Sequence, residues 1–264
     1  NDEWCKTVFP DLPLDEAWDK LFEAIMYTSR VSIDKDPAEE WKKHTKSLED
    51  HSKIMNDYNF KKLHFKNQLG TDLEVELVEN HIWAGGGENG GNGIYFVPNI
   101  PTEEVFTMPH RNGVNGKVFS TKPLNYQGNL IRDFYFVFKD GKVVDYNAKE
   151  GYEALKSLVE LDEGSSRLGE VALISNNSPI SNLNILFNDT LFDENASCHL
   201  ALGNAYSMNV VGGTTMSIEE LKKIGYNVSI THVDFMFGSA DMQIVGTTHD
   251  GKEVVIFEKG NFVI

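Results

Sequence analysis

Apolar residues in the first sixty positions recur at the spacing of helices. Leu14, Leu21 and Ile25 fall on one face of a predicted helix over residues 13–30. A second helix is predicted to begin at DPAEE, where Asp36 suits the N-cap and the following proline suits the first helical position. We therefore expect an N-terminal helical segment.

From residue 60 onward, apolar and polar residues alternate, as in strands with one side facing solvent. In TDLEVELVE, Leu73, Val75 and Leu77 alternate with acidic residues. Further strands are predicted at 60–65, 132–138, 142–146, 171–174, 226–238 and 252–257, with Asp-Gly turn signals at Asp140-Gly141 and Asp250-Gly251. Helices are predicted near 150–160 and at 217–224, the second with a capping box from Ser217 to Glu220. The predicted fold is α+β, with a largely antiparallel β-sheet core and flanking helices.

Length and pattern together predict how the chain is organised. Its 264 residues are close to the upper limit for one continuous core, so one large domain or two intimate subdomains are both open. We interpret residues 1–59 as the helical segment and residues 60–264 as a mainly β part.

Charge and composition argue against several kinds of partner. The net charge of −16 repels phosphate backbones, so we expect no nucleic-acid partner. No apolar run approaches the ~20 residues that a membrane span needs, so we expect no membrane insertion. Two distant cysteines fit a reducing cytoplasm better than a disulfide-stabilised exterior.

A glycine-rich run, GGGENGGNG at residues 85–93, formally contains G-x-G-x-x-G. A phosphate cradle needs a helix after the glycines, whereas this run leads into the extended, proline-containing IYFVPNIP. We interpret the run as a flexible loop, with the preceding Trp83 as a candidate pocket wall.

The stretch YNVSITHVDFMFG is the most informative one for chemistry. In a strand, His232 and Asp234 point to the same face, because they are two residues apart. An imidazole and a carboxylate suit a divalent metal. A histidine packed beside its orienting carboxylate has the same pattern, so both interpretations stay open.

Two other motifs supply candidate carboxylates. Glu170 precedes the apolar strand VALI, where an unpaired carboxylate is costly to bury. In NIPTEEVFT, Glu103 and Glu104 are neighbours in an extended segment, so at most one of them is expected to enter a site.

The stretch LFDENASCHLALGNAY at residues 191–206 is ambiguous on its own. It brings Glu194, His199 and Tyr206 into apolar surroundings, and an isolated histidine there is typical of a packed core. If the stretch is helical, Tyr206 shares a face with His199. Cys198 cannot face its neighbour His199 in a helix or strand, which disfavours a Cys-His nucleophile made from these two. The whole inventory is rich in carboxylates, as hydrolytic metal sites are, and poor in the thiolates of structural zinc.

The motifs NIPTEEVFT, GEVAL, LFDENASCHLALGNAY and HVDFMFGS, in this order and spacing, resemble the M29 family of metallo-aminopeptidases over essentially the whole chain. The resemblance implies a site with two divalent metal ions, zinc or cobalt in preference to magnesium or manganese. The implied metal ligands are Glu104, Glu170, Glu194, His199, His232 and Asp234. The choice of Glu104 over Glu103 follows the interval alone. Tyr206 is the implied active-site tyrosine, and we expect Glu170 to be the bridging, catalytic carboxylate.

The resemblance also implies a biological role. Family members are cytoplasmic homodimers that remove N-terminal residues from peptides with a free N-terminus. They carry an additional N-terminal domain, so we expect residues 1–264 to be the C-terminal catalytic part. The alternatives are an inactive metal- or peptide-binding fragment and, less favoured, a cysteine hydrolase using Cys198.

Overall fold

Three helices form the first part of the chain in the computed structural model, which describes all residues 1–264. They are α1 (Asp2–Val8), α2 (Leu14–Thr28) and α3 (Pro37–Tyr58). Asp36 caps α3 by accepting the N–H of Ala38, and Pro37 lies in the first turn, as predicted. The predicted helix over residues 13–30 is confirmed as α2.

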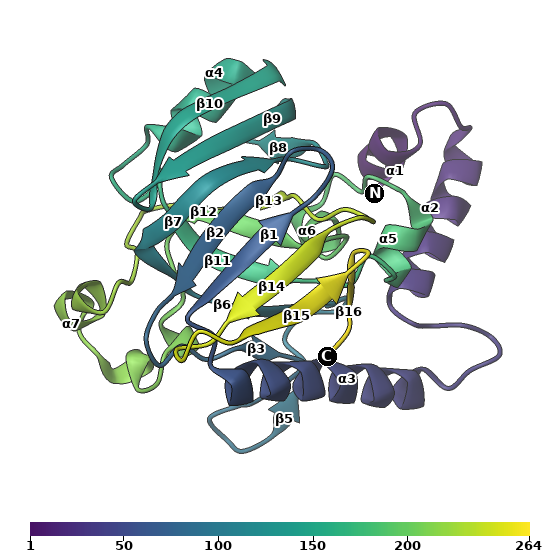
Figure 1. Ribbon diagram of the computed structural model, residues 1–264. Helices are drawn as coiled ribbons and strands as arrows, with labels where there is room; N and C mark the ends of the chain where they lie inside the picture. The colour runs from purple at the N-terminus through teal and green to yellow at the C-terminus, as the bar shows by residue number, and fades with distance from the viewer.

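The larger of the two main sheets lies in front in Figure 1 and has nine antiparallel strands. In spatial order its strands are β10 (Lys142–Glu150), β9 (Asn129–Lys139), β7 (Pro109–Phe119), β2 (Asp72–Leu77), β1 (Lys62–Lys66), β14 (Gln243–Thr247), β15 (Glu253–Glu258) and β16 (Asn261–Phe262), with β8 (Leu124–Tyr126) paired to β9. The two predicted Asp-Gly turns join β9 to β10 and β14 to β15.

The smaller sheet lies behind the larger one and contains the sequence motifs. Its spatial order is β13 (His232–Met236), β12 (His199–Gly203), β11 (Leu168–Leu173), β6 (Val105–Thr107) and β3 (Ala84–Gly85), and all its pairs are antiparallel. A separate two-stranded hairpin consists of β4 (Glu88–Asn89) and β5 (Tyr95–Phe96).

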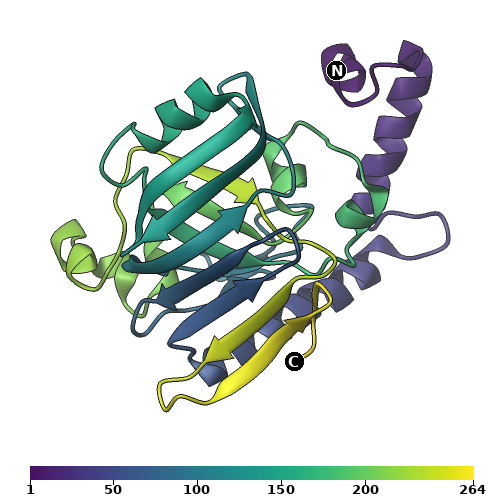
Figure 2. The ribbon, with the colours of Figure 1, turned by 45° about the horizontal axis from the view of Figure 1, so that its top comes forward.

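The two main sheets pack face to face (Figure 2), and aromatic side chains fill the space between them. Phe134 and Phe136 of β9 contact Phe235 of β13 with ring centroids 6.0 and 5.0 Å apart. Phe65 of β1 packs edge-on against Phe237, just after β13, at 5.2 Å. These contacts belong to the main core, so the smaller sheet has one face fixed against the larger sheet.

Short helices surround the sheets. They are α4 (Tyr152–Val159), α5 (Pro179–Leu183), α6 (Thr190–Glu194) and α7 (Ile218–Lys223), with 3₁₀ turns η1 (Ser207–Asn209) and η2 (Gly213–Thr215). The predicted capping box of Ser217 and Glu220 is present at α7. A second small core joins α1 and α2 to α5 and α6 through Leu21, Ile180 and Phe192. The α+β prediction is confirmed, and no helix is both long and apolar enough to cross a membrane.

Three local expectations differ from the structure, wholly or in their bounds. Trp83 is buried in the main core and does not line the pocket of the candidate site. The stretch 191–206 is not one helix, because α6 ends at Glu194 and β12 begins at His199. The predicted strand over 226–238 pairs only over the five residues of β13.

Candidate metal centre

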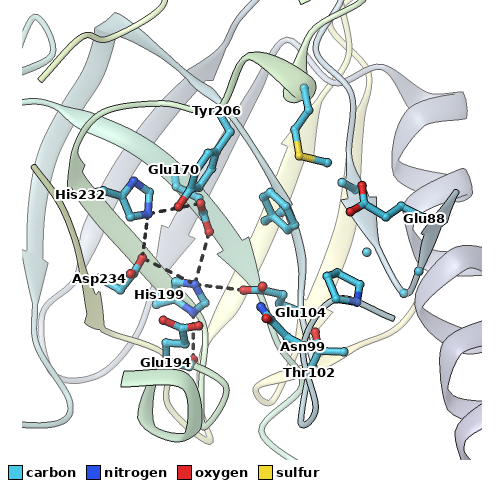
Figure 3. Close-up of a pocket in the computed structure, with 17 residues that line it drawn as sticks. Glu88, Asn99, Thr102, Glu104, Glu170, Glu194, His199, Tyr206, His232 and Asp234 are labelled. Carbon is cyan, nitrogen blue, oxygen red and sulfur yellow. Dashed lines mark hydrogen bonds and ion pairs between the residues drawn. The ribbon is translucent and has the colours of Figure 1, made fainter. Parts of the chain in front are cut away.

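The six predicted ligands and Tyr206 line one pocket at the face of the smaller sheet turned away from the larger sheet (Figure 3). Four come from its three adjacent strands, namely Glu170 on β11, His199 on β12, and His232 and Asp234 on β13. Glu104 directly precedes β6, and Glu194 is the last residue of α6. Segments that are distant in sequence therefore meet in one site.

Strand register explains why four of these side chains point the same way. Ala201 of β12 lies opposite Glu170 on one side and Asp234 on the other. His199 is two residues from Ala201, and His232 is two residues from Asp234, so all four share a face of the sheet. The small side chain of Ala201 leaves room between them.

The ligand atoms form two groups that share Glu170. Oε1 of Glu170 lies 3.5 Å from His199 Nε2, and Oε2 lies 3.6 Å from His232 Nε2. His199 Nε2 is also 3.2 Å from Glu104 Oε2, and His232 Nε2 is 3.4 Å from Asp234 Oδ1. Glu104, Glu170 and His199 can thus hold one ion, and Glu170, His232 and Asp234 a second.

Backbone carbonyls orient both imidazoles. The Nδ1–H of His199 donates to the Glu194 carbonyl at 2.9 Å, and that of His232 donates to the Asn204 carbonyl at 2.7 Å. Because a carbonyl can only accept, Nδ1 carries a proton in both rings, and Nε2 is the nitrogen that faces the carboxylates. Metal-bound histidines are held in the same way.

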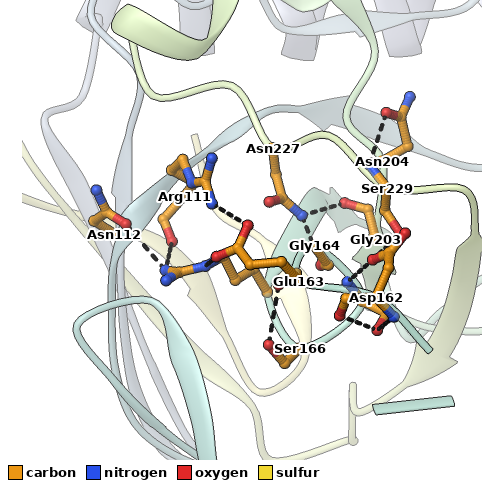
Figure 4. A network of polar contacts seen from close by, with 12 residues as sticks. Arg111, Asn112, Asp162, Glu163, Gly164, Ser166, Gly203, Asn204, Asn227 and Ser229 are labelled. Carbon is orange, nitrogen blue, oxygen red and sulfur yellow. Dashed lines mark hydrogen bonds and ion pairs between the residues drawn. The ribbon is translucent and has the colours of Figure 1, made fainter. Parts of the chain in front are cut away.

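A polar network holds the segment that leads into β13 (Figure 4). The Asp162 carboxylate accepts the Ser229 hydroxyl at 2.8 Å and the Ile230 N–H at 2.8 Å. The buried Asn227 side chain donates to the carbonyls of Gly164 and Gly203. These bonds, together with backbone bonds from the segment after β12, hold residues 227–231 and fix the approach to His232.

Burial and mutual repulsion raise the pKa values of two carboxyl groups of the site, Glu170 and Glu194. Burial raises the pKa of Glu170 to about 7, with the charges of Glu104 and Asp234 adding to the rise and His199 opposing it. Burial, followed by the charge of Asp234, raises the pKa of Glu194 to about 8. A divalent cation supplies the positive charge that would keep these groups ionised.

The pKa values of the two imidazoles are also raised, but by the neighbouring carboxylates and against the effect of burial. Burial acts to lower the pKa of His232, but the Asp234 carboxylate, 3.4 Å from its Nε2, and the nearby negative charges raise it to about 9. Burial likewise acts against a charge on His199, but the nearby carboxylates of Glu104 and Glu170 outweigh burial, so the pKa of His199 lies well above its usual value.

The donor set fits divalent metal ions. Carboxylates and imidazoles suit zinc, cobalt and similar ions. Oδ1 of Asp234 is buried without a hydrogen-bond partner, which is costly unless a ligand satisfies it. Glu194 lines the same pocket without belonging to either tight group.

Tyr206 lines the pocket although it does not share a helix with His199. It follows β12, and its ring lies 4.7 Å from the His232 ring. Burial, with the charges of Glu170 and Asp234 adding to it, raises the pKa of Tyr206 to about 12, so its hydroxyl keeps a proton at neutral pH.

Cys198 lies outside the site. Its thiol is buried and bonded to the backbone of Ile174, and burial raises its pKa to about 11. A thiol this hard to ionise is a poor nucleophile.

Sequence reasoning missed the outer wall of the pocket. Phe106, Met208 and Glu88 line it, together with glycines of the run interpreted as a flexible loop. Phe106 lies two residues after Glu104 in an extended segment, and that spacing could have placed it on the same side as Glu104. Glu88 had no such signal, because its placement depends on the hairpin of β4 and β5.

Comparison with known proteins shows what the chain is similar to. A family model described as thermophilic metalloprotease (M29) matches residues 1–262. Aminopeptidase 2 of Geobacillus stearothermophilus is 51% identical over 259 residues, which are 98% of this chain and 62% of the relative. Aminopeptidase AmpS of Bacillus subtilis (strain 168) is 50% identical over 98% of this chain and 63% of the relative.

Structural comparison agrees. Wild-type AmpT from Thermus thermophilus matches 100% of this chain and 63% of its own chain, with a TM-score of 0.93 and 40% identity. This chain therefore spans less than two thirds of the length of these relatives.

Proposed function

Because the chain belongs to the thermophilic metalloprotease (M29) family, we propose that it forms the catalytic part of a two-metal aminopeptidase. The proposed substrates are peptides with a free N-terminus. The observation that carries the proposal is the pair of ligand groups joined by Glu170, since one shared carboxylate is how two hydrolytic ions are held close together.

The proposed ligands are Glu104, Glu170, Glu194, His199, His232 and Asp234, with Glu170 as the bridge. Divalent ions held by these residues, zinc or cobalt by preference, would supply Lewis-acid chemistry by lowering the pKa of water and polarising the scissile carbonyl. Within this proposal the enzyme is a cytoplasmic homodimer.

The chain's own residues then have distinct tasks. Glu194 lies outside the tight groups and is the carboxylate least committed to metal, so it is our candidate for moving the proton. Tyr206 keeps its proton and is our candidate donor to the developing oxyanion. A spare carboxylate of the pocket, or one of the metal ions, would receive the substrate's α-amino group.

A hydrolysis assay on metal-reconstituted full-length protein tests the proposal. We expect release of the N-terminal residue from free-amine peptides and no cleavage of N-acetylated ones. We expect Glu170→Gln to lose both ions and the activity together, whereas the surface variant Glu150→Gln should keep both. Metal binding without cleavage of either peptide would favour a metal-binding fragment, and loss of activity on thiol alkylation would favour a cysteine hydrolase.

A further inference from the structure

Glu103 is adjacent to the proposed ligand Glu104, yet its side chain enters a different environment. Its carboxylate forms a two-pronged ion pair with Arg30, with Nη1 2.6 Å from Oε1 and Nη2 2.8 Å from Oε2. The pair is largely buried, with side-chain exposures of 15% for Arg30 and 6% for Glu103. Such a planar pairing fixes orientation as well as charge.

The backbone on either side of Glu103 is held as well. The Nε2–H of His44 on α3 donates to the Thr102 carbonyl at 2.6 Å, and the Glu103 N–H donates to the side chain of Asn195 at 2.7 Å. Asn195 directly follows Glu194. The segment before β6 is thus clamped between the helical part of the chain and α6.

Arg30 is itself fixed in place. Its guanidinium lies over the Trp41 ring, 5.4 Å from the centroid, and its Nη2 donates to Nδ1 of His44 at 3.0 Å. Because His44 Nε2 donates and Nδ1 accepts, the ring is neutral. Burial, which lowers the pKa of His44, supports this state.

Neighbouring residues of an extended segment face opposite sides, so anchoring Glu103 forces Glu104 toward His199. We propose that Arg30 and Glu103 are positioning residues that hold Glu104 in its ligand orientation. This role rests on the proposed function. It also makes residue 30, which is 73 positions away in sequence, a determinant of metal affinity.

Cobalt binding to the full-length protein tests this role without relying on activity. We expect Arg30→Met to weaken Co²⁺ binding about 10–100-fold, the usual cost of losing an outer-shell support. The visible spectrum of the bound cobalt should change, because Glu104 no longer keeps its geometry. Arg30→Lys should cause a smaller loss of Co²⁺ affinity, because its ammonium group keeps the positive charge but cannot form the two parallel hydrogen bonds to Glu103.

Two further variants separate positioning from folding. The double variant Arg30→Met/Glu103→Met leaves no unpaired buried charge, so it should fold while still binding cobalt more weakly than wild type. Arg132→Met removes an exposed ion pair with Glu150 and should leave affinity and spectrum unchanged.

The outcomes distinguish this inference from the proposed function. A folded double variant with wild-type affinity and spectrum would overturn the positioning role while leaving the proposed function intact. Wild-type protein that neither binds cobalt nor cleaves peptide would overturn both.

Discussion

The hydroxyl of Tyr206 is a candidate for stabilising charge that develops only during reaction. Its ring packs against His232, and its side chain is absent from the ligand groups. Tyr206→Phe keeps the packing and removes one donor. We therefore expect kcat to fall on the order of 10²–10³-fold, with little change in KM or metal content. Steady-state kinetics with saturating metal measures this.

Tyr146→Phe provides a matched control. Burial and the nearby Glu160 also raise the pKa of Tyr146 to about 12. Tyr146 lies on β10, however, which belongs to the larger sheet and not to the sheet that carries the site. It should leave kcat unchanged. If Tyr206→Phe does the same, Tyr206 only packs and has no part in the chemistry.

Residue-level prediction succeeded where alternation decides the outcome. The two-residue spacing of His232 and Asp234 predicted that their side chains share one face of a strand. Adjacent residues of an extended segment point in opposite directions, so only one of Glu103 and Glu104 was expected in the pocket, and only Glu104 lines it. The partner of Glu103 could not be predicted, because Arg30 is brought to it by the packing of helices α2 and α3 rather than by any local pattern.

Two Asp-Gly turns allow a test at the level of elements. Gly141 and Gly251 both have a positive φ, of 78° and 85°. A Cβ at Gly141 would lie 1.8 Å from the Arg111 carbonyl oxygen, whereas one at Gly251 meets nothing within 4 Å. Gly251→Ala should cost about 1–2 kcal/mol of unfolding free energy, from backbone strain alone. Gly141→Ala should cost about 1–3 kcal/mol more.

Urea unfolding of both variants measures the difference. Equal losses would mean that the chain near Arg111 relaxes without cost and that the β9–β10 turn is not closely packed.

Element boundaries were predictable only where local chemistry sets them. The cap at Asp36 and the capping box at Ser217 mark helix starts through bonds within a few residues. The start of β13 was predicted too early, because residues 227–231 look like a strand but are bound by side chains such as Asp162.

At the scale of the molecule, sheet order depends on contacts that no local pattern contains. β2 pairs with β7, and β1 pairs with β14 from the far end of the chain. The antiparallel α+β class could be predicted from turns and alternation, whereas these pairings are selected by the packing of two sheets around a common core.

The metal-free protein should become less stable as pH rises from 7 to 9. Folded-state pKa values of about 8 for Glu194 and about 9 for His232 exceed the ordinary values of 4.5 and 6.5. The folded state therefore holds more protons than the unfolded state in this range, and the unfolding free energy falls with pH. Buried His44, His51 and His81, whose pKa values burial lowers, have the opposite sign but act mainly below pH 6.5.

Thermal unfolding of chelator-treated protein measures this loss. Each proton held only by the folded state steepens the slope by up to about 1.4 kcal/mol per pH unit, and we expect Tm to fall by more than about 2 °C per unit. Saturating zinc or cobalt should flatten the dependence or reverse it, because cations bind the deprotonated ligands and their affinity increases as protons leave. His232→Gln should reduce the slope in the metal-free protein, since it removes one of the retained protons. If the Tm of the metal-free wild type were flat or rose with pH, the folded state would not retain extra protons on Glu194 and His232 in this range.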